Sequence, residues 1–286
     1  MPHDQRVCAA TNELWASSRG AGRGVQADVA PTCRGLQRLL LPFLVLAALI
    51  GARESVWAQA PADVSAAEAC LGANQNISLG APLPRAAAQL RSGGPFRVVA
   101  IGSSSTTGLW VLNPAATFPE VMRRELMRLR PKSQVEAINS GRVGDTIPGN
   151  LARLDRDVLH HDPDLVVWQL GTNDVAWGGG TEGLEAQIAN GIGTIKANGA
   201  DVILMDLQYS AFVLSSSRHS AMQAIIAAAA RQARVGLFSR FELMRRSVEA
   251  GVSAGALVSW DRLHNSADGY DCIGRALARA IHAAAD

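Results

Sequence analysis

Asp261 and His264 form the acid–base pair that the sequence indicates most directly, because a carboxylate stands three residues before a histidine. Across one turn of chain, the carboxylate can accept a hydrogen bond from the imidazole Nδ1 and so set its tautomer and orientation. The other ring nitrogen, Nε2, is then free to act as a general base toward a hydroxyl nucleophile. The alternative is an Asp/His pair on the surface that has no partner.

Hydroxyl groups for such a base are concentrated in the segment 102–108, which reads GSSSTTG and follows an apolar run. This segment lacks the lysine of a phosphate-binding P-loop and the glycine spacing of a dinucleotide-binding turn. It also lacks the second glycine of the GxSxG nucleophile turn, because Thr106 stands at that position. Hydroxyl residues also cap helices, so this segment alone does not identify a nucleophile.

Two further segments hold groups that can stabilise negative charge on an oxygen. Asn173, in the run GTND at 171–174, carries a side-chain amide that can donate to a developing oxyanion. Gly144, in the segment 140–146, offers a backbone N–H for the same purpose. The alternative is a turn in which Asn173 and Asp174 bond their own backbone. Neither segment identifies a site when it is taken singly.

Alternating strands and helices are predicted to position these segments. Short apolar runs predict strands at 96–101, 134–139, 165–170, 201–207 and 235–239. Apolar residues at helical spacing predict helices at 118–129, 151–159, 184–195, 222–233 and 268–284. This alternation indicates an α/β fold with a parallel sheet covered on both faces. In such sheets the functional crevice lies beyond the carboxyl ends of the strands, where four loops follow: 102–108, 140–146, 171–180 and 208–217.

Taken together and in this order, four blocks resemble the SGNH hydrolase superfamily, also called the GDSL esterases, over residues 96–286. They are Ser104 after the first strand, Gly144 after the second, Asn173 after the third, and the Asp261–His264 pair before the last helix. The resemblance implies a flavodoxin-like three-layer α/β/α sandwich. Its five-stranded parallel sheet would have the order 2-1-3-4-5.

The resemblance also implies a role for each residue. Ser104 would be the nucleophile, His264 the general base that later protonates the leaving alcohol, and Asp261 the group that orients the imidazole. The oxyanion hole would consist of the backbone N–H groups of Ser104 and Gly144 and the side chain of Asn173. This machinery requires no cofactor and no metal.

The first block departs from the family pattern. The family usually reads Gly-Asp-Ser-Leu, whereas this chain has Gly102-Ser103-Ser104-Ser105. The missing Asp is not the nucleophile, so catalysis survives, but the hydrogen bonding beneath the loop must differ. Ser103 and Ser105 remain alternative nucleophiles, and the alignment of Gly102 and Thr106 favours Ser104.

A serine esterase acting on short-acyl or O-acetyl esters outside the cytoplasm is the function that we expect. Trp110, Trp177, Tyr209 and Phe212 lie in or beside the candidate loops, where aromatic rings could stack on a sugar or line an acyl pocket. The expected substrate is a small-molecule or polysaccharide ester. The alternatives are an acyltransferase that uses the same triad and a non-catalytic carbohydrate-binding module.

Composition excludes two classes of protein and one kind of partner. Charged residues make up 18% of the chain and hydrophobic residues 48%, which excludes a disordered solvating protein. Four cysteines in 286 residues are too few for a disulfide scaffold. The formal net charge of +2 predicts no nucleic-acid partner. The cluster 160–164, with two His and two Asp, is not expected to bind a metal, because adjacent ligands rarely converge.

Residues 1–60 are interpreted as a leader with a secretory signal. Their apolar run 39–50 would span about 18 Å as a helix, too short for the roughly 30 Å hydrocarbon core of a membrane. Two arginines precede this run and small residues follow it, which favours cleavage after Ala58. An uncleaved anchor or a buried helix is the alternative. We therefore expect a secreted or periplasmic bacterial protein with no stable membrane span after cleavage. The predicted divisions are a leader at 1–60, an N-terminal extension at 61–95 and a hydrolase domain at 96–286.

Cys70 and Cys272 are the cysteines that remain after removal of residues 1–60. Because an exported protein meets oxidising conditions, they could form a disulfide bridge that ties the N-terminal segment to the last helix. Two unrelated buried thiols are the alternative. The residues alone do not decide between the two.

Overall fold

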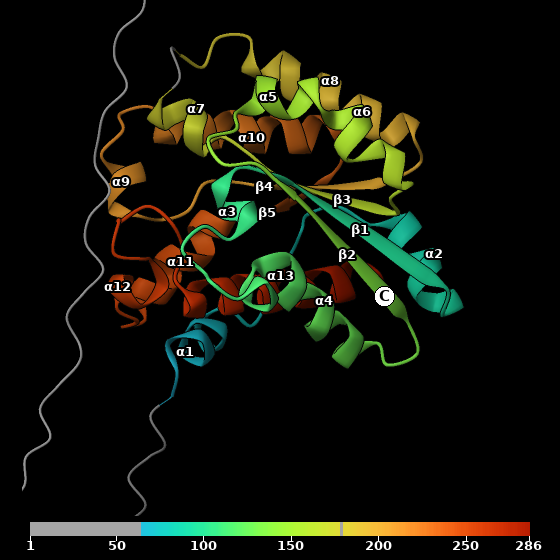
Figure 1. Ribbon diagram of the computed structural model, residues 1–286, viewed down its shortest axis with the longest axis horizontal. Coiled ribbons are helices and arrows are strands. Elements are labelled where there is room, and N and C mark those ends of the chain that lie inside the picture. Colours follow the sequence, from blue (N-terminus) through green and yellow to red (C-terminus); the bar gives the residue numbers. More distant parts are fainter. Residues whose placement is uncertain (1–63, 178–179) are drawn as a thin grey trace, which may run out of the picture. The chain divides into compact units, whose positions relative to one another are not determined.

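One all-parallel sheet forms the centre of the computed structural model, which describes residues 64–177 and 180–286 (Figure 1). Its strand order is β2-β1-β3-β4-β5. The strands are β1 (Pro95–Gly102), β2 (Gln134–Gly141), β3 (Leu165–Gln169), β4 (Asp201–Met205) and β5 (Gly236–Phe238). The predicted α/β class, with a five-stranded parallel sheet of order 2-1-3-4-5 between helical layers, is therefore confirmed.

Helices cover both faces of this sheet (Figure 1). One face carries α1 (Ala66–Ala73), α2 (Pro84–Ser92), α4 (Phe118–Leu129), α11 (Arg240–Glu249), α12 (Ala254–Leu257) and α13 (Ala267–Ala284). The other carries α5 (Ile147–Ala152), α6 (Leu154–Asp157), α7 (Thr172–Ala176), α8 (Leu184–Ala197), α9 (Ala211–Leu214) and α10 (His219–Ala233). The remaining short helices are α3 (Ser104–Thr107), η1 (Pro114–Ala116) and η2 (Leu159–His161).

The apolar strands supply two separate cores, one on each face. Along β1, Val98 and Ala100 join the core under α4 and α13, whereas Val99 and Ile101 join the core under α8 and α10. Side chains alternate between the faces of a strand, so a strand buried on both faces must be apolar at nearly every position. This is why the central strands are recognisable as uninterrupted apolar runs.

The predicted helix at 151–159 is wrong, because the chain divides there into α5, α6 and η2. Arg153 sits between α5 and α6 with φ −122°, outside the helical region, and its side chain turns into the protein. At the end of α6, the backbone carbonyl of Asp157 accepts a hydrogen bond from the Ser140 hydroxyl at 2.6 Å. Contacts with distant residues therefore override the apolar spacing.

The helix predicted at 184–195 forms in spite of its glycines. Gly191 faces the sheet, and a Cβ at this position would lie 2.5 Å from the ring of Trp168 on β3. The glycine lets α8 approach a large aromatic side chain closely, which offsets its poor helix propensity.

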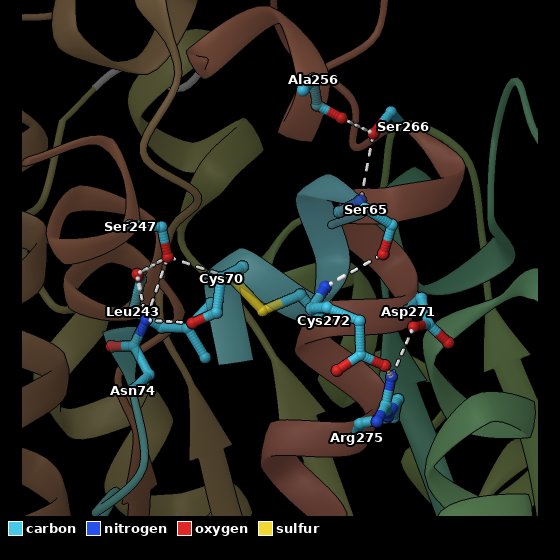
Figure 2. The surroundings of a disulfide bond; sticks show 12 residues. Ser65, Cys70, Asn74, Leu243, Ser247, Ala256, Ser266, Asp271, Cys272 and Arg275 are labelled. Atoms are coloured by element: carbon cyan, nitrogen blue, oxygen red, sulfur yellow. Dashed lines mark hydrogen bonds and ion pairs between the residues drawn. A yellow bond between two sulfur atoms is a disulfide. The ribbon is translucent and has the colours of Figure 1, made fainter. Parts of the chain in front are cut away.

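Cys70 on α1 and Cys272 on α13 are joined by a disulfide bond (Figure 2). Both residues are fully buried. Beside them, the side-chain amide of Asn74 donates to the Cys70 carbonyl at 2.9 Å, to the Leu243 carbonyl at 3.1 Å and to the Ser247 hydroxyl at 3.0 Å. Of the two alternatives for these cysteines, the structure contains the bridge.

The N-terminal helices were not predicted, yet they pack into the same core as α4 and α13. Ala67 and Leu71 of α1 and Ala86 and Leu90 of α2 are buried there. The boundary between an extension at 61–95 and a domain from residue 96 stays a prediction. The predicted leader lies outside the described residues. Within the described part, no helix is long and apolar enough to cross a membrane.

The loops that follow β1 and β2 are held together by the buried guanidinium of Arg153. It donates to the backbone carbonyls of Gly102 at 3.0 Å and Ser140 at 2.8 Å. It also forms an ion pair with Asp145 at 2.6 Å, and both side chains are nearly inaccessible to solvent. One side chain therefore connects the ends of two strands with the loop that carries Gly144.

The first loop rests on Gln169, the last residue of β3. Its Oε1 accepts from the Ser103 N–H at 2.8 Å, the Ser103 hydroxyl at 3.0 Å and the Thr106 hydroxyl at 3.1 Å. Gly102 leaves the room for this contact, because a Cβ there would lie 2.7 Å from the same oxygen. Ser103 stands where the GDSL block has its Asp. In this chain, Gln169 supplies the hydrogen-bond acceptor beneath the loop.

Replacing Gln169 by Met tests this support for the loop. The side chain keeps its approximate volume but leaves three buried donors without an acceptor, and each such loss costs about 1–3 kcal/mol. We expect the free energy of unfolding in urea to fall by about 3 kcal/mol. The matched control is Gln134→Met, on the exposed start of β2, which should change stability by less than about 0.5 kcal/mol. Equal stability of the two variants would contradict the assignment.

Candidate active site

Ser104, His264 and Asp261 form a continuous chain of hydrogen bonds. Ser104 Oγ lies 2.7 Å from His264 Nε2, and His264 Nδ1 lies 2.5 Å from Asp261 Oδ2. With the proton on Nδ1, the imidazole donates to the carboxylate and accepts from the hydroxyl. Ser104 and His264 are 160 positions apart, so the fold, rather than local sequence, makes this contact.

The Asp261 carboxylate receives donors on both oxygens. Oδ1 accepts from the backbone N–H groups of Leu263 and His264, each at 3.0 Å. Oδ2 accepts from His264 Nδ1 and from the indole N–H of Trp110 at 2.7 Å. Partial burial by itself would raise the pKa of Asp261, but these hydrogen bonds outweigh it and lower the pKa to about 2. The carboxylate is therefore ionised at neutral pH.

The three consecutive serines differ in their hydrogen-bond partners and in their burial. The Ser103 hydroxyl is used by Gln169, whereas the Ser104 hydroxyl points at His264. Ser105 is 1% exposed. Ser104 is the first residue of α3, and Ser103 alone separates it from β1. The N–H groups in a helix's first turn have no partner within the helix. Of the alternatives left open by the sequence, the geometry favours Ser104.

Asn173 and Gly144 meet at one loop. Asn173, near the start of α7, is 4% exposed and its Nδ2 donates to the Asp145 carbonyl at 2.8 Å. Gly144 precedes Asp145 in a turn with φ +78°, a conformation that favours glycine. β2 is paired with β1 in parallel register, with Gly102 opposite Gly141, so the Gly144 loop leaves the sheet at the same edge as Ser104. The assignment of Ser104, Gly144 and Asn173 to an oxyanion hole stays a prediction.

Residues beneath His264 were missed by the sequence analysis. The fully buried Gln208 donates to the carbonyl of Leu263 at 3.0 Å and accepts from Thr172 at 2.9 Å and from Arg240 at 2.8 Å. Arg240 also donates to the Asp206 carbonyl at 2.9 Å. Gln208 thereby links the histidine loop to α7 and α11. No local pattern marks these residues, because their partners lie more than 30 positions away in the chain.

The buried Asp206 and Arg240 both have shifted pKa values. Burial raises the pKa of the Asp206 carboxyl, although it accepts hydrogen bonds from Ser239 and from the Phe241 N–H. Burial lowers the pKa of the Arg240 guanidinium, and the charge of Asp206 opposes that shift. Both effects follow from removing a charged group from water. Their hydrogen bonds indicate a supporting role for this pair.

The histidine cluster before β3 is part of the scaffold. Asp164 accepts from Arg85 at 2.8 Å, Gln89 at 3.0 Å and the Arg97 N–H at 2.9 Å, which fastens α2 to β1 and β3. His161 contributes its backbone carbonyl to Arg97. Across residues 64–177 and 180–286, no group of three or more His, Cys, Asp or Glu side chains is arranged to hold a metal ion.

Exposed aromatic side chains lie beside the triad. Trp110 packs against Trp260 with 5.1 Å between ring centroids, and these residues are 50% and 76% exposed. Trp177 packs against Phe212 at 5.5 Å. Because Trp110 contacts Asp261 and Trp260 directly precedes it, the first pair adjoins the catalytic candidates. The sequence analysis named Trp110 but not Trp260.

A family model described as the non-GDSL lipase-like family matches residues 69–286. Among curated proteins, an arylesterase of Vibrio mimicus is 30% identical to this chain over 112 residues, which are 39% of this chain and 54% of that protein. The chain therefore spans about half the length of this curated relative.

Two solved structures share the fold. A two-domain esterase active on acetylated mannans, co-crystallised with mannopentaose, aligns with a TM-score of 0.64 and 18% identity over 74% of this chain and 56% of that one. The acetylxylan esterase Axe2 of Geobacillus stearothermophilus aligns with a TM-score of 0.54 and 22% identity over 65% of this chain and 94% of that one. At these identities the likeness concerns the fold alone. Because the family model covers more than half of its length, the chain belongs to the non-GDSL lipase-like family.

Proposed function

We propose that this protein is a serine esterase that hydrolyses carboxylic esters through Ser104, His264 and Asp261. The observation that carries the proposal is the hydrogen-bond chain from Ser104 Oγ through the His264 ring to Asp261 Oδ2, with distances of 2.7 and 2.5 Å. A hydroxyl, a base and an orienting carboxylate in this order are the groups that acyl transfer through a serine requires. Membership of a lipase-like family and similarity to an arylesterase support the same reaction.

In the first half-reaction, Ser104 Oγ bonds to the ester carbonyl carbon while its proton passes to His264 Nε2. The carbonyl electron pair moves to the oxygen, which becomes an oxyanion. When the oxyanion collapses, the bond from carbon to the alcohol oxygen breaks, and the alcohol takes the proton from Nε2. The Asp261 carboxylate stabilises the imidazolium that exists between these events.

In the second half-reaction, water replaces the alcohol. A water molecule bonds to the acyl carbon and gives a proton to His264 Nε2, and collapse then breaks the bond to Ser104 Oγ. Ser104 recovers its proton from Nε2, and the carboxylic acid leaves. An acceptor alcohol in place of water would give acyl transfer, which product analysis with and without added alcohols distinguishes.

The oxyanion would be held by the backbone N–H groups of Ser104 and Gly144 and by the Asn173 amide. An amide nitrogen carries two hydrogens, and Asn173 Nδ2 uses one of them to reach the Asp145 carbonyl. This contact aims the side chain and leaves the second hydrogen for the substrate. Donors fixed before the reaction stabilise developing charge without reorganising, which is the main source of their catalytic effect.

Short acyl groups on a carbohydrate are the substrate class that we propose. The structural neighbours include esterases that act on acetylated mannans and on acetylxylan. The exposed Trp110–Trp260 pair beside Asp261 provides aromatic faces on which a sugar ring could rest. Disulfide bonds persist mainly in oxidising compartments, so the Cys70–Cys272 bridge supports a location outside the cytoplasm. The secretory signal predicted in residues 1–60 favours the same location.

Ser104→Ala and Ser103→Ala separate the nucleophile from its neighbour. Removal of the Ser104 hydroxyl should abolish hydrolysis of p-nitrophenyl acetate, because no acyl-enzyme can form. Ser103→Ala should retain most of the activity, because it loses only one hydrogen bond to Gln169. Steady-state kinetics on both folded variants provide the measurement. A fully active Ser104→Ala protein, or loss of activity in Ser103→Ala alone, would refute the assignment.

Asn173→Ala tests the oxyanion donor. We expect kcat for p-nitrophenyl acetate to fall by about 10²–10³ with little change in KM, because the oxyanion exists only after attack. Asn190→Ala, an exposed position on α8, is the matched control and should leave kcat unchanged. A loss in Asn173→Ala of less than about threefold would remove Asn173 from the oxyanion hole.

Trp260→Ala tests the carbohydrate surface. If a sugar ring rests on the Trp110–Trp260 pair, KM for an acetylated oligosaccharide should rise about tenfold. The same variant should hydrolyse p-nitrophenyl acetate with kcat/KM changed by less than about threefold, since this small ester has no sugar to bind. An unchanged KM for the oligosaccharide would exclude this surface.

A further inference from the structure

Trp110 makes a contact that nothing in the proposed mechanism uses. Its indole N–H donates at 2.7 Å to Asp261 Oδ2, the oxygen that also accepts from His264 Nδ1. We propose that Trp110 is a positioning residue of the active site, which holds the Asp261 carboxylate through this N–H and so fixes the orientation of His264. The inference rests on the proposed function, because it concerns the same triad.

Trp110 differs from the other hydrogen-bond donors to Asp261 in its distance along the chain. The two donors to Oδ1 and the imidazole donor to Oδ2 all come from the turn 261–264. Trp110 comes from the segment after α3, 151 positions away. Among the hydrogen bonds to this carboxylate from the described residues, the one from Trp110 alone joins the turn 261–264 to the segment that follows Ser104.

A closed circuit of hydrogen bonds results. The N–H groups of Gly108 and Leu109 both donate to the Ser104 carbonyl at 3.1 Å, which fastens the segment leading to Trp110 onto the nucleophile residue. From Trp110 the circuit continues through Asp261 and His264 back to Ser104 Oγ. Displacement of any member therefore disturbs the distance between the hydroxyl and its base.

The backbone of Trp110 adopts a conformation that a tryptophan rarely takes. Its φ is +73°, in the left-handed region, where a bulky side chain is strained. Such strain persists only where the surrounding structure imposes it, and strained residues cluster at functional sites. In this chain the left-handed turn accompanies the placement of the indole N–H on Asp261 Oδ2.

The indole N–H also adds to the hydrogen bonds that keep the Asp261 carboxylate ionised. Hydrogen bonds to the ionised form keep an acid ionised, and the bond from Trp110 is among those that lower the pKa of Asp261. The Trp110 ring packs against Trp260 while its N–H reaches Asp261 Oδ2. A phenyl ring at position 110 would keep an apolar cover but provide no donor.

The experiment is a double-mutant cycle on kcat. Trp110→Phe removes the donor, and we expect kcat for p-nitrophenyl acetate to fall about tenfold with KM unchanged, because the group acts on the base and not on the ester. In an Asp261→Ala background, Trp110→Phe should cause no further loss, since its partner is already absent. Asn190→Ala, at an exposed position on α8 outside the site, is the control and should leave kcat unchanged.

Three results would overturn the inference. They are an unchanged kcat in Trp110→Phe, an equal loss in the presence and absence of Asp261, and a loss that appears only in KM. If Trp110→Phe fails to fold, replacement of Trp110 by 3-benzothienylalanine keeps the bicyclic ring and removes only the N–H. Ser104→Ala separates failure of the proposed esterase function from failure of the role proposed for Trp110. An active Ser104→Ala protein overturns the proposed function, whereas an inactive one beside a fully active Trp110→Phe protein overturns the role of Trp110 alone.

Discussion

The hydrogen bond between Ser104 Oγ and His264 Nε2 joins the end of the first strand to the turn before the last helix. It can form only if the carboxyl edge of the sheet brings both segments to one point. β1 is the second strand in the order β2-β1-β3-β4-β5, so the loop carrying Ser104 lies between those carrying Gly144 and Asn173. The parallel register thereby places the candidate nucleophile between two candidate oxyanion donors before any substrate binds.

Buried polar side chains hold the loops beyond the strands in the positions that the hydrogen bond between Ser104 and His264 requires. Gln169 supports the loop that carries Ser104, Arg153 joins that loop to the Gly144 loop, and Gln208 with Arg240 supports the carbonyl before His264. Each side chain bonds backbone groups at or just beyond the ends of the strands. Unpaired polar groups in such positions are costly, so these bonds restrict the loops to one arrangement.

The sequence predicts well what depends on periodicity and poorly what depends on distant partners. The strands of the sheet and the helix 118–129 follow from apolar runs and spacing, and the motif order indicated Ser104, Asp261 and His264 as neighbours. The break at Arg153 was missed because its partners at Gly102, Ser140 and Asp145 belong to other elements. Trp110 was noted only as an aromatic residue, since nothing local reveals a bond to Asp261.

The central claim is that Ser104 attacks an ester carbonyl while three donors receive the oxyanion. The most direct measurement is a crystal structure of the protein after reaction with a fluorophosphonate. The account predicts phosphorus bonded to Ser104 Oγ, with the phosphoryl oxygen about 3 Å from the N–H groups of Ser104 and Gly144 and from Asn173 Nδ2. Phosphorus on Ser103 or Ser105, or a phosphoryl oxygen directed away from these donors, would contradict it.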